Sequence, residues 1–413
     1  MPDLDDFKAG DEPAVQVEGL MPTITLGFIP LTDCAVLAVA RELGFAQGEG
    51  LDLRLSREVS WANIRDKVAF GLLDGAQMLA AMPIASSLGI NQVRMPMIAP
   101  FCLNRNGNAI TVSAGLYEEM RALSGLRGDE GPRALGKALC AVIAARKERG
   151  QPALTFGTVY PFSCHTYELR YWMAACGIDP EADVHLLVVP PPLMVDNLRD
   201  GYVDGFCVGE PWNSLAVEAG LGRIVVNKSE LWRRGVEKML CVPHALAIDQ
   251  PDALAALIRA LDRAARWSDD PANRHDLAEL LAAPAYLDVP APIVVRALSG
   301  ELVPARGQPA RHVPDFLVLH REGANRPPVD QARWLYSQML RWNQTEASMH
   351  DELVVPTIFR PDIYEAALAG ETWSDFPAPV ASPAVLLPEE IFFDGGGYNA
   401  DRSAKPSTSS PKF

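Results

Sequence analysis

The sequence predicts a two-lobed α/β protein. At 413 residues the chain is too long for one ordinary hydrophobic core, so about two lobes are expected. From about residue 22, short apolar strands alternate with helical patterns, which is typical of a mostly parallel sheet covered by helices. A charged helical segment, residues 117–150, precedes a second block of the same alternation. Two such lobes predict a ligand cleft between them, where strand ends converge.

The first block is defined by the periodicity of its apolar residues. Period-two alternation indicates a half-buried strand, whereas glycines close a helical pattern. Ser60 is a candidate N-cap. In order, the block gives a buried strand at 24–30, a helix at 33–50, a half-buried strand at 51–58, a helix at 60–75, and a strand end at 75–83 that runs into a loop.

The second block repeats this pattern and then becomes helical after Lys238. It predicts strands at 154–160, 184–190, 203–211 and 223–229, and helices at 165–180, 191–201 and 212–222. We therefore expect a discontinuous lobe I at residues 22–118 and 240–385, and lobe II at residues 119–239. Residues 1–21 are expected to be flexible, and the Gly/Ser/Pro-rich tail, residues 386–413, to be disordered.

Composition excludes several classes of function. The net charge of −15, with no basic stripe, argues against direct nucleic-acid binding, so a small anion would have to be held by local geometry. No apolar stretch reaches 18 residues, and the acidic N-terminus does not have the pattern of a signal peptide, which predicts a cytoplasmic protein without a membrane span. Seven cysteines, an odd number and several in apolar runs, indicate reduced thiols.

Motifs for chemistry are missing from the sequence. It contains no Walker A loop, no dinucleotide-binding glycine pattern, no nucleophile elbow and no CxxC pair. His312 and His320 are eight residues apart, and no third ligand lies near them. We therefore expect a binding protein with no catalytic residues, no cofactor and no metal site.

Five positions in loops or at element ends allow both a structural and a ligand-binding interpretation. Lys238, in GVEKMLCV, lies at the mouth of an apolar run, either snorkelling or facing an anion. His165, in FSCHTYELRYW, is either an exposed residue of a capped first turn or an anion ligand. Trp61 suits an interdomain core or an indole donor, Asn108 follows a turn, and Glu210 lies in a strand-to-helix turn.

Five ordered segments resemble one known family. SWANIRD, DGAQMLAAMP, LNRNGNAITVS, HTYELRYWMAACGIDP and VDGFCVGEPWN…ELWRRGVEK are similar to the nitrate- and bicarbonate-binding proteins of ABC uptake systems. The resemblance covers about residues 22–385 and implies a type II periplasmic-binding-protein-like fold, a two-lobed clam-shell with a central ligand cleft. It implies a nitrate or nitrite site formed by Trp61, Asn108, His165 and Lys238, with Gly209 and Glu210 lining the wall.

Two positions depart from the family pattern, and a third distinguishes the nitrate binders from the bicarbonate binders. Asn108 stands where nitrate binders commonly carry glutamine, and Gln77 stands where they carry histidine. Nitrate binders carry lysine at the position of Lys238, whereas bicarbonate binders carry an acidic residue associated with calcium. Charge-assisted hydrogen bonds of about 1.5–3 kcal/mol each would support a nitrate Kd of about 1 μM. If His165 must be charged, affinity should weaken as pH rises.

The resemblance extends to NasS-like cytoplasmic nitrate/nitrite sensors. It implies a protein that holds an RNA-binding antiterminator partner (NasT-like) inactive and releases it on anion binding, thereby regulating nitrate assimilation. The alternatives are a nitrate-binding component of an ABC uptake system and a clam-shell enzyme such as a thiamin pyrimidine synthase, for which we see no matching cysteine cluster. The residues do not rank nitrate against nitrite.

Overall fold

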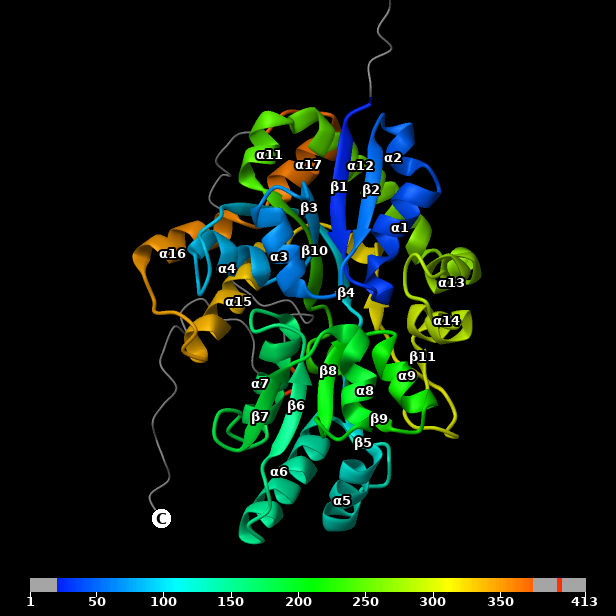
Figure 1. The fold of residues 1–413 in the computed structure, drawn as a ribbon, viewed down its shortest axis with the longest axis vertical. Coiled ribbons are helices and arrows are strands. Elements are labelled where there is room, and N and C mark those ends of the chain that lie inside the picture. The colour runs from blue at the N-terminus through cyan, green and yellow to red at the C-terminus, as the bar shows by residue number, and fades with distance from the viewer. Residues whose placement is uncertain (1–20, 374–391, 396–413) are drawn as a thin grey trace, which may run out of the picture.

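The computed structural model describes residues 21–373 and 392–395, which form two α/β lobes (Figure 1). Lobe I contains a six-stranded sheet and lies in the upper part of the view; lobe II contains a five-stranded sheet and lies below it. The lobe I sheet has the order β13-β4-β10-β3-β1-β2, with β1 (Thr23–Phe28), β2 (Asp52–Arg57), β3 (Gly75–Leu79), β4 (Met97–Asn106), β10 (Val236–Pro243) and β13 (Leu317–Val318). The lobe II sheet has the order β7-β6-β8-β5-β9, with β5 (Asn108–Ser113), β6 (Leu154–Thr158), β7 (Val184–Val188), β8 (Gly205–Gly209) and β9 (Gly222–Asn227).

Helices cover both sheets. Lobe I carries α1 (Ala35–Glu42), α2 (Phe45–Gly48), α3 (Trp61–Ala69), α4 (Met82–Leu88), α11 (His244–Asp249), α12 (Pro251–Asp269), α13 (Arg274–Ala282), α14 (Ala291–Ser299), α15 (Val329–Arg341), α16 (Met349–Val354) and α17 (Pro361–Ala369). Lobe II carries α5 (Ala114–Ser124), α6 (Pro132–Glu148), α7 (Cys164–Ala175), α8 (Met194–Arg199) and α9 (Trp212–Glu218), and α10 (Lys228–Leu231) follows β9. A short ribbon of β11 (Glu301–Leu302) and β12 (Arg311–His312) completes the strands. Within the described ranges, no helix has the length and hydrophobicity needed to cross a membrane.

The expectation of mostly parallel sheets is wrong for the strands that connect the lobes. β1 pairs in parallel with β2 and β3, and β6 pairs in parallel with β7 and β8. However, β10 runs antiparallel to both β3 and β4, and β5 runs antiparallel to both β8 and β9. β4 carries the chain out of lobe I and β10 brings it back, so these neighbours must run in opposite directions.

The chain crosses between the sheets at two places that differ from the expected boundaries. The first crossing is at Gly107, between β4 and β5, eleven residues before the boundary expected at 118/119. Gly107 has φ +94°, and a Cβ there would approach Leu317 Cδ1 to 2.8 Å, so the turn requires glycine. The second crossing lies between β9 and β10, so Lys238 belongs to a lobe I strand, not to the end of lobe II. At both crossings the sequence pattern changes only after the backbone has passed into the other lobe. The boundaries expected from that pattern therefore lie too late in the sequence.

Two further expectations need local correction. The helix expected at 33–50 is divided into α1 and α2, because Gly44 adopts the left-handed conformation between them. The loop expected after β3 is instead occupied by α4. Ser60 does cap α3, its Oγ accepting a hydrogen bond from Asn63 N at 3.2 Å, as predicted. All seven cysteines are unpaired, as expected.

Part of the tail that was expected to be disordered is packed against the protein. Phe392 is 3% exposed and forms a β-bridge with Trp232, while Phe393 N donates to Leu231 O at 2.9 Å. The Phe392 ring lies 4.7 Å from the Trp232 ring and 5.2 Å from the Trp334 ring, centroid to centroid. The expectations for residues 1–20, 374–391 and 396–413 lie outside the described residues.

Candidate functional site

Lys238 lies in the middle of β10 with its side chain fully buried. Its Nζ is 2.9 Å from Asp33 Oδ2 and 2.9 Å from Glu237 Oε1, and it lies 5.6 Å from the centroid of the Trp61 ring. Neighbouring side chains of a regular strand point to opposite faces, but the pairing of β10 with β4 shifts register on both sides of Lys238. This irregularity brings Glu237 and Lys238 into the same interior.

A second buried lysine, Lys228, lies at the start of α10. Its Nζ is 2.7 Å from Glu168 Oε1 and contacts Glu237 Oε2 at 2.5 Å, and it donates to Val236 O at 2.7 Å. Because Glu237 bridges both lysines, the charged groups form one connected set. We call this set the buried ion network: Asp33, Glu168, Lys228, Glu237 and Lys238.

Three of the residues predicted from the sequence attach directly to the buried ion network. Asn108 Nδ2 donates to Glu168 Oε2 at 3.2 Å. Gln77 Nε2 donates to Asp33 Oδ1 at 2.6 Å, and Gln77 Oε1 accepts from the backbone N of Ile29 at 3.1 Å. His165 Nδ1 lies 3.4 Å from Glu237 Oε1. Gln77 therefore holds Asp33 against Lys238, a role that its sequence motif did not reveal.

The predicted residues also carry polar atoms without partners. Trp61 Nε1, both ring nitrogens of His165, Asn108 Oδ1 and Glu210 Oε1 are buried and make no hydrogen bond to any described residue. Buried polar groups are nearly always hydrogen-bonded, and unpaired ones concentrate where a ligand or water completes the site. The buried unpaired atoms therefore make these residues candidates for a ligand site.

Gly209 and Glu210 lie where lobe II meets lobe I. A Cβ at Gly209 would lie 3.3 Å from Leu31 Cδ2, a tight contact, and 3.5 Å from Asp33 Oδ2, an ordinary one, so β8 runs close to the network. Glu210 O accepts from Thr32 N at 2.8 Å, and Glu210 Oε2 accepts from Ser214 N at 3.2 Å. Glu210 thus joins the lobes through its backbone while its second carboxylate oxygen stays unpaired.

Burial and charge set the protonation of these groups. Burial lowers the pKa of His165 to about 3, so the imidazole is neutral at pH 7. Burial raises the pKa of Glu168 to about 7, against the pull of Lys228, and it raises the pKa of Glu210 to about 7. Burial also acts to raise the pKa of Glu237, but His165 and the two lysines hold it well below its usual range.

The structure settles the local alternatives for two positions. Ser163 caps α7, its Oγ accepting from Thr166 N at 3.1 Å, but His165 is fully buried and not an exposed residue of that first turn. Trp61 packs in an apolar cluster with residues of both lobes, yet its Nε1 stays unpaired, so it combines the two interpretations.

Sequence reasoning missed Asp33, Glu168, Lys228 and Glu237. Glu237 and Lys238 are adjacent charged residues in the strand segment VEKML, whereas Lys228 lies in the mixed polar segment VNKSELW. Charged residues are almost never fully buried unless they are paired. Apart from the adjacent pair Glu237–Lys238, the partners could not be deduced, because they lie on other elements and at least nine residues apart in the sequence.

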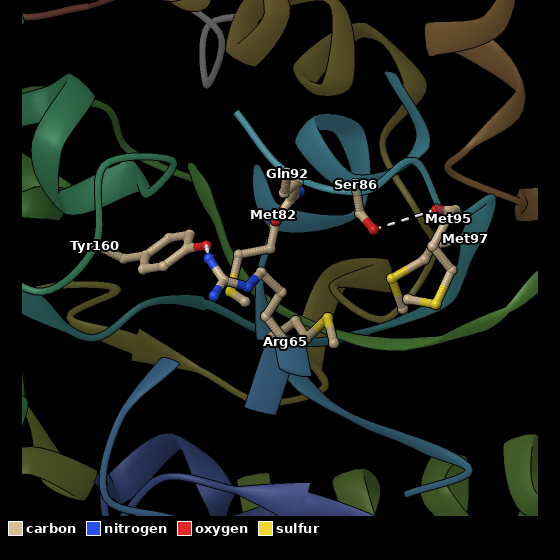
Figure 2. A pocket seen from close by; sticks show the side chains of 8 residues that line it. Arg65, Met82, Ser86, Gln92, Met95, Met97 and Tyr160 are labelled. Atoms are coloured by element: carbon tan, nitrogen blue, oxygen red, sulfur yellow. Dashed lines mark hydrogen bonds between the residues drawn. The ribbon is translucent and has the colours of Figure 1, made fainter. Parts of the chain in front are cut away.

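Residues outside the buried ion network line a small pocket (Figure 2). It is lined by Arg65, Met78, Met82, Ser86, Gln92, Met95, Met97 and Tyr160. Arg65 of lobe I donates to Tyr160 Oη of lobe II at 3.1 Å, so this pocket contains a contact between the lobes. None of the predicted anion ligands lines it.

A sequence model of the NMT1-like family matches residues 20–282. The chain belongs to this family. The nitrate/nitrite binding protein NrtA of Synechococcus elongatus is 32% identical over 95% of this chain and 85% of that protein. The bicarbonate-binding protein CmpA of the same species is 29% identical over 92% and 84%. The crystal structure of the periplasmic nitrate-binding protein NrtA from Synechocystis PCC 6803 has a TM-score of 0.79 at 27% identity, covering 91% of this chain and 94% of that one.

These likenesses confirm the periplasmic-binding-protein-like fold and the family of nitrate- and bicarbonate-binding proteins. The chain also matches the nitrate and bicarbonate transport ATP-binding proteins NrtC and CmpC, and it spans about half the length of these relatives. The named relatives are binding or transport proteins. The desulfurization enzyme DszB, at 15% identity, shares the fold alone.

Proposed function

We propose that this NMT1-like protein binds nitrate or nitrite between its lobes and acts as a cytoplasmic sensor of nitrate assimilation. The observation that carries the binding proposal is the fully buried Lys238, surrounded by the unpaired Trp61 Nε1 and His165 ring nitrogens. Indole N–H groups only donate, and a neutral imidazole donates from one nitrogen. An oxyanion supplies the acceptors that these donors lack.

The ligand must be small and carry few hydrogen-bond donors. Trp61, Asn108, His165 and Lys238 are each at most 1% exposed, so a bound ligand would be enclosed by both lobes. Nitrate and nitrite are compact, singly charged and acceptor-only. The printed names of the NrtA relatives, nitrate/nitrite binding proteins, support this choice of ligand.

Binding would act through closure of the lobes. A ligand shifts a conformational equilibrium only by its differential affinity for the two states, and contacts from both lobes exist only when the lobes are closed. Lys238 belongs to lobe I, whereas His165 and Asn108 belong to lobe II. The anion therefore favours the closed form, which we propose releases an RNA-binding antiterminator partner (NasT-like).

The sensor role is supported by the similarity of the site segments to NasS-like sensors. The relatives include nitrate import and bicarbonate transport proteins, and a binding component of an ABC uptake system would use the same anion site. Two measurements separate these roles. A sensor is recovered in the cytoplasmic fraction and loses its antiterminator partner when nitrate is added, whereas an uptake component is found outside the cytoplasm and binds no such partner.

Calorimetric titration tests the binding proposal. We expect nitrate or nitrite to bind the purified chain with a Kd of about 1 μM, and Lys238→Met to weaken binding by about 100-fold, equivalent to about 3 kcal/mol. Lys67→Met, which removes a half-exposed lysine paired with Glu58, is the matched control and should bind normally. A folded protein that ignores both anions, or that binds bicarbonate only with calcium, would contradict the proposal.

A further inference from the structure

The positive charges of the site are already compensated. Lys238 Nζ contacts Asp33 and Glu237, and Lys228 Nζ contacts Glu168 and Glu237, so two ammonium groups face three carboxyl groups. All five side chains are at most 2% exposed, which removes them from solvent screening. The family resemblance implied that Lys238 faces the anion as its counter-charge. In the structure its charge is already paired, so Lys238 is not a free counter-charge.

An anion that enters this closed site must bring a positive charge with it. Burying an uncompensated charge is costly, and the nearby carboxylates would repel the anion. A metal cation is one source of charge, and Cys164, Glu168 and Glu237 offer ligand atoms within 4.8 Å of one another, but Lys228 Nζ already pairs with both carboxylates. The remaining source is a proton.

His165 is placed to accept that proton. Its Nδ1 lies 3.4 Å from Glu237 Oε1, and neither ring nitrogen makes a hydrogen bond to a described residue. A proton would complete an ion pair with Glu237 through Nδ1 and leave Nε2–H free to donate to the anion. The titratable and charged groups that face His165 are Glu237 and Lys238 on β10, Lys228 on α10, and Cys164 and Glu168 on its own helix α7, with Asp33 behind Lys238.

We propose that nitrate or nitrite enters this site together with one proton, which His165 holds between the anion and Glu237. The proposal rests on the anion site described above. In the unliganded protein His165 is neutral at pH 7, because burial lowers its pKa. Binding therefore consumes a proton, and by linkage the nitrate Kd should increase about tenfold for each unit of rising pH around neutrality.

Titration calorimetry measures the proton directly. Nitrate is titrated at one pH into the protein in two buffers of different ionisation enthalpy, and the difference in heat gives the number of protons taken up. We expect one proton per anion, and a Kd about tenfold weaker at pH 8 than at pH 7. His165→Gln should bind nitrate more weakly with no proton uptake, whereas His312→Gln, an exposed matched control, should behave like the parent chain.

Glu168→Gln tests whether the proton lies on His165 or on the neighbouring carboxyl. Under the proposal this variant still takes up one proton. If Glu168→Gln loses the uptake and His165→Gln keeps it, the assignment to His165 is overturned. Imidazole ¹⁵N shifts of the parent chain give a readout that needs no variant, because one of the seven histidines should become protonated on nitrate addition.

The failure of this proposal is distinguishable from the failure of the anion site. Nitrate binding with equal heat in both buffers and a Kd independent of pH would overturn proton uptake while leaving the anion site intact. If neither nitrate nor nitrite binds at any pH, the anion site and the proton proposal fall together.

Discussion

Lys228 lies between two buried carboxylates, Glu168 and Glu237, and its ammonium also donates to a backbone carbonyl. Glu168 and Glu237 pull the pKa of Lys228 well above its usual range, although burial acts to lower it. Removing one member of a buried charge group leaves the others uncompensated, which costs more than the pair itself contributes. Lys228 thus determines whether the site can exist in its closed form.

We expect Lys228→Met to destabilise the protein by about 3–5 kcal/mol, because it leaves Glu168 and Glu237 buried beside a single lysine. Urea unfolding followed by circular dichroism measures this change. Lys147→Met, which breaks an exposed ion pair with Asp183, is the matched control and should change stability by less than about 0.5 kcal/mol. Adding Glu168→Gln to Lys228→Met should restore part of the loss; an unchanged or lower stability would argue against charge imbalance as the cause.

The sequence singled out Lys238 and the uncharged residues beside the buried ion network better than it singled out the carboxylates of that network. Trp61, His165 and Lys238 stand out because their residue types are unusual at a helix start, beside a cap and in an apolar strand. Asp33 and Glu168 do not stand out, since acidic residues in helices and turns are usually solvent-exposed. Their burial depends on contacts between segments at least 60 residues apart, because Glu168 and Lys228 are separated by 60 positions and Asp33 and Lys238 by 205, and local patterns do not encode such contacts.

At the scale of elements, the C-terminal segment 392–395 joins parts of both lobes. Phe392 packs on Trp232, which follows α10, on Trp334 of α15, and on Tyr171 of α7, with ring centroids 4.7 to 5.2 Å apart. Tyr171 belongs to lobe II and Trp334 to lobe I. This segment therefore packs against, and is expected to stabilise, the second crossing of the chain between the lobes.

Phe392→Ala should lower the free energy of unfolding by about 3 kcal/mol, because it removes a buried ring from an aromatic cluster. It should also increase amide hydrogen exchange at residues 228–235 by loosening the crossing. Both are measurable on the purified chain, by chemical unfolding and by exchange mass spectrometry. Phe70→Ala, at a ring that is 80% exposed, is the control. Equal stability of the two variants would show that the segment does not hold the crossing.

Element prediction succeeded where one strand or helix explains its own pattern. β2 and α3 fall within the expected ranges, and β1 and α7 each begin one residue before theirs, because the periodicity of these elements is set by burial on one face. It failed for strand direction at β10 and for the tail at Phe392. The direction of β10 follows from the path of the chain between the lobes, which local periodicity does not show. In the tail, the Gly/Ser/Pro-rich composition conceals Phe392 and Phe393, whose packing partners come together only in the folded protein.

At the scale of the whole molecule, hydrogen bonds join the two lobes. Thr32 N donates to Glu210 O, Trp212 Nε1 donates to Pro30 O at 3.2 Å, and Tyr167 Oη donates to Gln344 Oε1 at 2.7 Å. Such contacts form only while the lobes lie against each other. Under the proposed function the anion favours this arrangement, and ligand exchange requires the lobes to open.

Tyr160 offers a test of closure that does not touch the anion ligands. Its Oη accepts a hydrogen bond from Arg65 across the lobes, and neither residue belongs to the buried ion network (Figure 2). Tyr160→Phe removes this bond and keeps the ring. A hydrogen bond to a charged donor contributes about 1.5–3 kcal/mol at most, and partial exposure reduces this, so we expect nitrate affinity to fall about 3- to 10-fold.

The loss should appear in the dissociation rate of nitrate, because the bond forms after the lobes close and slows their reopening. Stopped-flow displacement of nitrate measures that rate, and Tyr202→Phe, at an exposed tyrosine, should leave it unchanged. A slower association rate with normal dissociation would mean that Tyr160 acts on access to the open site instead. Both variants keep all the proposed anion ligands. Faster dissociation in Tyr160→Phe alone would therefore show that part of the affinity comes from the closed arrangement of the lobes. The proposed release of a partner depends on the same arrangement.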